Sequence, residues 1–173
     1  MPILRKQMRL PRRYYLGARG YFVTVCCDLR RAFLAEAATA ELVRACLLDV
    51  AQRDGFLVAA YCVTPDHLHF LAQGMIEGAD LCQCIRTFKS RSAFAFRQRR
   101  NCQLWEASYY EHILREEDSP EEIAHYIWWN PVRKGLCKEP EEYPYSGSQT
   151  ILWGNGAIPP TTWVPPDGVV AEL

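Results

Sequence analysis

Hydrophobic and polar positions follow two different periods along the first part of the chain. Short apolar runs rich in β-branched and aromatic residues, at 21–28 and 56–63, are long enough for buried strands and too short for helices. Between them, apolar residues recur at helical spacing from Ala37 to Asp54, and Gly55 follows as a stop signal. This pattern predicts a strand, a helix and a second strand, in that order.

The middle of the chain adds two strands and a second helix. The turn sequence TPD leads into HLHFLAQG, which predicts a strand over 67–73, antiparallel to the strand before it. Residues 80–100 place apolar side chains on one stripe and most basic ones elsewhere, so we expect an amphipathic helix with a cationic outer face. The sequence SYYEHIL predicts a fourth strand at 108–114.

A last helix has a clear N-terminal signal. Ser119 is the expected N-cap, Pro120 the first helical residue, and Glu122 completes a capping box three residues beyond the cap. Because a residue that precedes proline is disfavoured in a helix, Pro131 predicts that this helix ends near Trp129.

The order of elements is β-α-β-β-α-β followed by one more helix. It predicts an α+β, ferredoxin-like fold, in which an antiparallel sheet carries helices on one face and a C-terminal helix follows. A length of 173 residues fits one domain. We expect that domain to span 1–136, with its core at about 12–136, and the Pro-rich residues 137–173 to form an extended tail.

Composition excludes several classes of protein. With 49% hydrophobic and 23% charged residues, the chain is globular rather than disordered. The sequence has no apolar run of the roughly 18 residues that span a membrane, and the first residues lack a signal-peptide core, so we expect a cytoplasmic protein without membrane contact. The eight cysteines have no disulfide-framework spacing and are expected to be buried free thiols.

Basic residues are unevenly distributed although the total charge balances. Residues 1–31 hold eight Arg or Lys against Asp28 alone, and residues 86–100 hold six against no acidic residue. With aromatic residues interleaved, such clusters are typical of a groove that follows a phosphate backbone. Taken alone, each cluster is more often a solvated face.

Two of the four histidines lie two residues apart in TPDHLHF. Side chains alternate along a strand, so His67 and His69 should point to one face while Leu68 fills the core. Two neutral imidazoles roughly 7 Å apart along a pleat can bind one divalent cation. For an isolated His-x-His, a pair of polar residues on an open sheet face is the more common explanation.

The segment HYIWWNPVRKG offers a third ligand and a reacting group. Tyr126 and Asn130 are four residues apart, so on a helix they share one face. The Asn130 amide oxygen could complete a His-His-Asn set for Mg²⁺ or Mn²⁺, with Tyr126 beside the metal as a nucleophile. Singly, Tyr126 would be interpreted as a packed helix aromatic and Asn130 as a helix-ending polar residue.

These residues resemble a known family. The stretches RRYYLGARGYFVTV, YCVTPDHLHFLAQG and LWEASYYEHILREEDSPEEIAHYIWWNPVRKGL together resemble the REP-associated tyrosine transposases, relatives of the single-tyrosine HUH transposases, from about Arg12 to Ser146. The resemblance implies that His67, His69 and Asn130 are the metal ligands and Tyr126 the catalytic tyrosine. Asparagine as the third ligand matches the REP-associated group.

The resemblance implies a metal-dependent nuclease and strand transferase that acts on single-stranded hairpin DNA through a 5′-phosphotyrosine, with Mg²⁺ or Mn²⁺ and no nucleotide cofactor. It leaves monomer and homodimer open. DNA contacts are expected from the N-terminal segment, the basic helix and the end of the last helix. The residues expected to make them are Arg12, Arg13, Tyr14, Arg86, Lys89, Arg91, Arg133 and Lys134.

Alternatives remain at this stage. The chain could recognise hairpins without cutting them, or it could be a zinc-stabilised domain using Cys82 and Cys84, although no paired C-x-x-C accompanies them. Tyr109 and Tyr110 are rival nucleophiles that lack an amide four residues on. His112 is expected to be structural or to contact DNA.

Overall fold

The computed structural model describes residues 9–150 and 156–166. Its longer helices and strands lie within a few residues of the predicted ranges. The strands are β1 (Gly20–Cys26), β2 (Phe56–Thr64), β3 (His67–Gly74), β4 (Tyr110–Ile113) and β5 (Ser146–Gly147), and the α-helices are α1 (Ala37–Arg53), α2 (Leu81–Arg97), α3 (Pro120–Trp128) and α4 (Asn130–Arg133). Short 3-10 turns occur at Arg12–Tyr15, Asp28–Arg30, Phe33–Ala35 and Pro140–Glu142.

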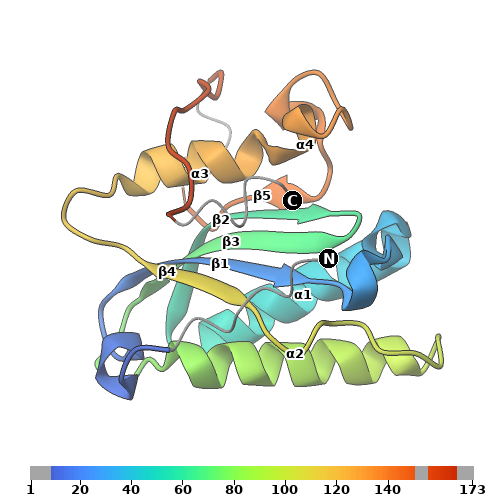
Figure 1. Ribbon diagram of the computed structural model, residues 1–173, viewed down its shortest axis with the longest axis horizontal. Helices are drawn as coiled ribbons and strands as arrows, with labels where there is room; N and C mark the ends of the chain where they lie inside the picture. Colours follow the sequence, from blue (N-terminus) through green and yellow to red (C-terminus); the bar gives the residue numbers. More distant parts are fainter. Residues whose placement is uncertain (1–8, 151–155, 167–173) are drawn as a thin grey trace.

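The strands form one antiparallel sheet in the order β4-β1-β3-β2-β5 (Figure 1). The first four strands have the order expected of the ferredoxin-like fold, so the predicted fold class is confirmed. The β1–β3 register pairs Thr24 with His69 and Cys26 with His67. This register places the end of β1 directly beside the two histidines.

Helices cover both faces of the sheet (Figure 1). The helices α1 and α2 pack on one face, where they enclose alternate strand residues such as Val23, Leu68 and Phe70. The helix α3 packs on the other face, against Phe22 and Leu71 among others. The helix α3 therefore lies on the face that α1 and α2 leave uncovered.

The predicted start and end of α3 are confirmed. The Ser119 hydroxyl accepts a hydrogen bond of 3.3 Å from the Glu122 amide, and Trp129 is the C-cap. The chain then begins α4 at Asn130, with Pro131 in its first turn, where a missing amide N–H costs no helical hydrogen bond.

The expected extended tail is in part built into the fold. Ser146 and Gly147 pair with β2, and the Trp128 indole donates to the Gly147 carbonyl at 3.0 Å. A side chain at position 147 would meet the Tyr61 hydroxyl at 2.6 Å, so only glycine allows this approach. Residues 151–155 and 167–173 of the tail, like Arg5 and Lys6 of the first basic cluster, lie outside the described residues.

Two compositional expectations can be compared with the structure. All eight cysteines fall within the described ranges, and every one is a free thiol. Only Cys27, Cys62 and Cys84 are buried, so the expected burial was wrong for the other five, which are partly exposed. Among the helices of residues 9–150 and 156–166, none is long and apolar enough to cross a membrane.

Candidate active site

The two histidines of β3 lie on the face that α3 covers. Their alternation with Leu68 is as predicted, because Leu68 packs in the core beneath α1 and α2. The expectation of an open sheet face was wrong, since both His67 and His69 are 0% exposed. Their ring centroids are 4.5 Å apart.

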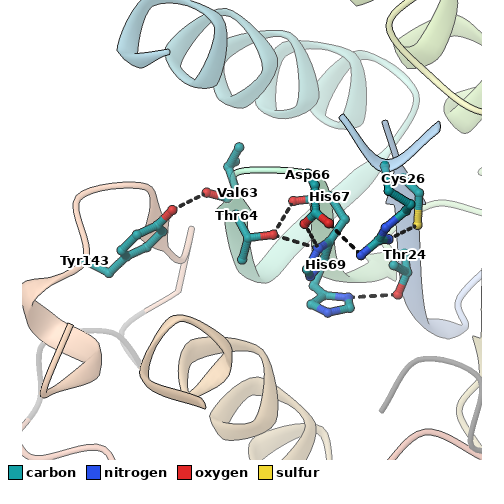
Figure 2. Close-up of polar contacts among 9 residues, drawn as sticks. Thr24, Cys26, Val63, Thr64, Asp66, His67, His69 and Tyr143 are labelled. Atoms are coloured by element: carbon teal, nitrogen blue, oxygen red, sulfur yellow. Dashed lines mark hydrogen bonds and ion pairs between the residues drawn. The ribbon is translucent and has the colours of Figure 1, made fainter. Parts of the chain in front are cut away.

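Each imidazole is fixed through its Nδ1 atom (Figure 2). The Nδ1 of His69 lies 2.8 Å from the Thr24 hydroxyl on β1. The Nδ1 of His67 lies 2.7 Å from the Asp66 carboxylate and 2.8 Å from the Thr64 hydroxyl. Partners of this kind fix the ring orientation and leave Nε2 as the atom that can bind a ligand.

Arg30 extends this network. Its guanidinium lies 2.9 Å from the free Asp66 oxygen and donates to the Cys26 sulfur at 2.8 Å. Leu29 and Arg30 adopt φ values of 52° and 55°, a left-handed conformation that is uncommon for residues other than glycine. This turn brings the guanidinium to the carboxylate that orients His67.

Three buried polar atoms near α3 lack a hydrogen-bond partner: Nε2 of His67, Nε2 of His69 and Oδ1 of Asn130. They are three of the five such side-chain atoms in the described residues. Buried polar groups are normally paired, and each unpaired one costs about 1–3 kcal/mol. Burial lowers the pKa of both histidines, so their Nε2 lone pairs are available at neutral pH. Two imidazoles and an amide oxygen suit a divalent cation.

Asn130 is needed for this set. Within residues 9–150 and 156–166 there is no group of three or more His, Cys, Asp or Glu side chains able to hold a metal. The zinc alternative therefore finds no support there. Cys84 is buried in the core of α1 and α2, and Cys82 accepts a long hydrogen bond from the Tyr109 hydroxyl.

Tyr126 of α3 lies beside the histidine pair. Its ring centroid is 6.1 Å from that of His69 and 5.9 Å from that of Phe22, and only 5% of the residue is exposed. Burial raises the pKa of Tyr126, whereas the adjacent Arg133 lowers it. The fold thus places Tyr126 beside His69, which lies beside His67, and the buried Asn130 follows as the first residue of α4.

The rival residues at and just before β4 divide between the two faces of the sheet. The Tyr109 side chain packs against the core of α1 and α2, away from His69. Tyr110 faces α3, with its ring 6.1 Å from that of Phe22, and its hydroxyl donates to the Pro166 carbonyl at 2.7 Å. His112 pairs with Asp118 at 2.7 Å, a structural contact and one of the two roles expected for it.

Residues 156–166 lie across this site and were not foreseen (Figure 1). The Trp163 ring centroid is 5.2 Å from that of Tyr126 and 5.3 Å from that of Phe22. The segment is held at one end by a hydrogen bond from the Trp129 indole to the Ile158 carbonyl at 2.9 Å. A proline-rich sequence gives no signal for a contact this distant in the chain.

Part of the basic surface lies far from Tyr126. The α2 residues Arg86, Lys89 and Arg91 are on the opposite side of the sheet from α3 (Figure 1). Lys89 donates to three carbonyls, those of Glu106, Ala107 and Ser108, at 2.7–3.2 Å. Its ammonium therefore ties α2 to the segment before β4.

Other basic residues have different surroundings. Arg12 pairs with Asp80 at 2.6 Å, and the Arg13 guanidinium lies 4.9 Å from the centre of the partly exposed Tyr14 ring. Arg133 and Lys134 of the segment after α3 are exposed. The structure thus brings only these last two, among the predicted DNA contacts, to the tyrosine helix.

Comparison with known proteins shows what the chain is similar to. Residues 19–130 match the family model described as "Transposase IS200 like". A REP-associated tyrosine transposase of Escherichia coli strain K12 is 26% identical over 135 residues, covering 78% of this chain and 79% of that protein.

Two solved structures resemble this chain. A REP-associated tyrosine transposase bound to a REP hairpin matches with a TM-score of 0.67 and 25% identity, covering 80% of this chain and 82% of that one. A Deinococcus radiodurans protein shares the fold, with a TM-score of 0.50 and 22% identity, covering 63% of this chain and 88% of that one.

Proposed function

The chain belongs to the IS200-like transposase family, and from this premise we propose that it is a metal-dependent endonuclease and strand transferase for single-stranded, hairpin-forming DNA. The relative solved with a REP hairpin supports a DNA hairpin as the partner. Action on such DNA would take place in the cytoplasm.

One observation carries the proposal. A buried tyrosine lies beside two buried imidazoles whose Nε2 atoms have no partner, and an unpartnered amide oxygen follows four residues after that tyrosine. A purely structural site would leave three polar atoms unsatisfied at a cost of several kcal/mol. A site that binds a cation accounts for all three.

His67, His69 and Asn130 would hold Mg²⁺ or Mn²⁺. When bound, the cation would polarise a non-bridging oxygen of the scissile phosphate as a Lewis acid. Asp66 and Thr24, with their contacts to the Nδ1 atoms, orient the two imidazoles for this role.

Tyr126 is the proposed nucleophile. Its hydroxyl oxygen attacks phosphorus and forms a 5′-phosphotyrosine, while the bond to the 3′ oxygen breaks and that oxygen leaves as a 3′-hydroxyl after taking up a proton. Attack by a 3′-hydroxyl on the phosphotyrosine reverses the exchange and joins strands, so no nucleotide cofactor is required. A phenol has an ordinary pKa near 10, so alignment and nearby positive charge must supply the activation.

Positive charge for the DNA strand is available beside the nucleophile. Arg133 and Lys134 are exposed and follow Tyr126 within two helical turns, so they are the proposed phosphate contacts nearest the reaction. Arg12, Arg13 and Tyr14, and the α2 residues Arg86, Lys89 and Arg91, could contact only parts of the hairpin away from the scissile phosphate.

The test is covalent capture of labelled DNA. The protein is incubated with Mn²⁺ and labelled single-stranded hairpins that carry flanking sequence, and adducts are resolved under denaturing conditions. We expect an adduct in the wild type and none in Tyr126→Phe, which keeps the ring and its packing. Tyr110→Phe serves as the matched control on the same face and should retain the adduct.

The second candidate is a protein that binds hairpins without cutting them. The low exposure of Tyr126 beneath Trp163 favours it in the state described here. Hairpin binding with no adduct, in the wild type and in Trp163→Ala alike, would support this candidate and reject the nuclease.

A further inference from the structure

Trp163 occupies a cage of aromatic rings on the nucleophile's face. Its ring centroid lies 5.3 Å from that of Phe22, 5.2 Å from that of Tyr126 and 6.4 Å from that of His112. These rings come from β1, α3 and β4, so the cage exists without the C-terminal segment. Aromatic platforms of this kind bind nucleobases by stacking and edge contacts.

The Trp163 indole makes one hydrogen bond in the cage, and a nucleobase could make the same one. The Trp163 Nε1–H lies 3.4 Å from Oδ1 of Asp118. The other carboxylate oxygen of Asp118 is already held by His112 Nε2 at 2.7 Å and by the Arg115 amide at 2.8 Å. A ligand in the cage therefore meets one fixed acceptor, which a ring N–H satisfies.

The segment that carries Trp163 is held by few contacts. Four of its residues, Pro159, Pro160, Pro165 and Pro166, have no N–H to donate. Within the described residues it forms no backbone–backbone hydrogen bond with the sheet. Its hold on the site comes from side chains, such as the Tyr110 hydroxyl on the Pro166 carbonyl. A competing ligand can displace such a segment without breaking a strand pairing.

We propose that the cage of Phe22, Tyr126 and His112 is a binding site for a purine base, guanine by preference, and that Trp163 fills it in place of that base. The indole is a fused bicycle like a purine. Guanine N1 carries a hydrogen at neutral pH, and N1 and the N2 amino group beside it can both donate toward Asp118. Adenine can donate only through its N6 amino group, with the acceptor N1 next to the carboxylate.

This inference rests on the proposed function for the position of the base. Because the Tyr126 ring is one wall of the cage, a bound base would belong to a nucleotide next to the scissile phosphate. The site would then select the nucleotide at the cleavage position through the protein itself.

The test uses free nucleotides without metal. The four deoxynucleoside 5′-monophosphates are titrated into the wild type, Trp163→Ala and the control Val164→Ala, whose side chain is on the same segment and 60% exposed. A tethered side chain competes at an effective concentration of about millimolar, so we expect Trp163→Ala to bind dGMP about tenfold more tightly than the wild type. Val164→Ala should match the wild type, and dGMP should bind more tightly than dAMP, dCMP or dTMP.

A measurement on the wild type avoids dependence on the variant's folding. The indole ¹⁵N–¹H signal of Trp163 should move toward the position of an exposed indole as dGMP is added. An unmoved signal at saturating dGMP, or equal binding by the wild type and a folded Trp163→Ala, would overturn the proposal. Equal affinity of Trp163→Ala for all four nucleotides would overturn the assignment to a purine.

The result of the nucleotide titration can be distinguished from the result of the DNA-cleavage test. Nucleotide binding requires neither metal nor the Tyr126 hydroxyl, so Trp163→Ala could bind dGMP in a protein that never forms an adduct. That result would support the base site and reject the nuclease. If the protein forms the adduct but Trp163→Ala gains no affinity for dGMP, the nuclease is supported and the base site is rejected.

Discussion

The Arg133 guanidinium lies over the ring of Tyr126, with its central carbon 4.2 Å from the ring centroid. The same side chain donates to the Tyr126 carbonyl at 2.8 Å, so its position is fixed by the residue that it covers. Burial raises the pKa of Tyr126, and Arg133 is the group that opposes this effect. The positive charge therefore stabilises the phenolate form of the proposed nucleophile.

Arg133→Met should slow adduct formation. Loss of a cation over an aromatic ring is worth about 1 kcal/mol or more, which corresponds to a rate reduced about fivefold or further. The pH at which the rate reaches half its maximum should also move upward, because the phenol becomes harder to ionise. Single-turnover rates measured across a range of pH test both effects.

The control for this experiment is Lys138→Met, at an exposed position beyond α4. It removes the same charge and should leave the pH profile where it is. If Lys138→Met slowed the reaction as much as Arg133→Met, a general charge effect on DNA binding would replace the role assigned to Arg133.

The contact between Thr24 and His69 predicts an effect on metal affinity. Thr24→Val keeps the shape of the side chain but leaves the Nδ1 of His69 without its partner. Loss of such a supporting contact typically weakens metal binding about 10- to 100-fold. Calorimetric titration with Mn²⁺ measures the change, and Thr87→Val on α2, far from the site, is the isosteric control. Unchanged Mn²⁺ affinity in Thr24→Val would show that His69 needs no such support.

The residues of the proposed reaction centre were selected from local periods in the sequence. A period of two along a strand places His67 and His69 on one side, and four-residue spacing relates Tyr126 to Asn130. Thr24 and Arg30 were missed because they reach the histidines through β1–β3 pairing and through a left-handed turn. Neither the register of distant strands nor that turn follows from local sequence.

The C-terminal region shows a second limit on what could be predicted from the sequence. Residues 137–173 were interpreted as a tail because prolines and glycines dominate it, yet β5 pairs with β2 and Trp163 packs on Phe22. The basic cluster of α2 was assigned to DNA from its charge alone. Charge in a sequence does not reveal which face of a sheet a helix covers, and α2 lies opposite α3.

Lys89 offers a test of that assignment. Because its ammonium satisfies three backbone carbonyls, Lys89→Met should destabilise the fold by about 1–2 kcal/mol in urea unfolding. Arg86→Met, at an exposed position of the same helix, should change the free energy of unfolding little. If Lys89 contacts a DNA phosphate instead, Lys89→Met should leave stability unchanged. It should then reduce the slope of the logarithm of the hairpin-binding constant against the logarithm of salt concentration by about one.

The two buried histidines make the stability of the metal-free protein depend on pH. Burial lowers the pKa of His67 and His69 below the ordinary value of 6.5. As the pH falls through 6.5, the unfolded chain takes up protons that the folded protein does not bind. Stability is therefore present above that pH and is lost below it, by about 1.4 kcal/mol per pH unit for each imidazole while it stays neutral in the fold.

Urea unfolding of the metal-free protein between about pH 7.5 and 5 should show this loss. His69→Gln removes one titrating group. It should reduce the slope of the unfolding free energy against pH by the amount due to one proton, about 1.4 kcal/mol per pH unit. Thr87→Val on α2, which removes no titrating group, is the control and should retain the wild-type slope. An equal slope in His69→Gln and the wild type would mean that His69 is charged within the fold, and a charged imidazole could not bind a cation through Nε2.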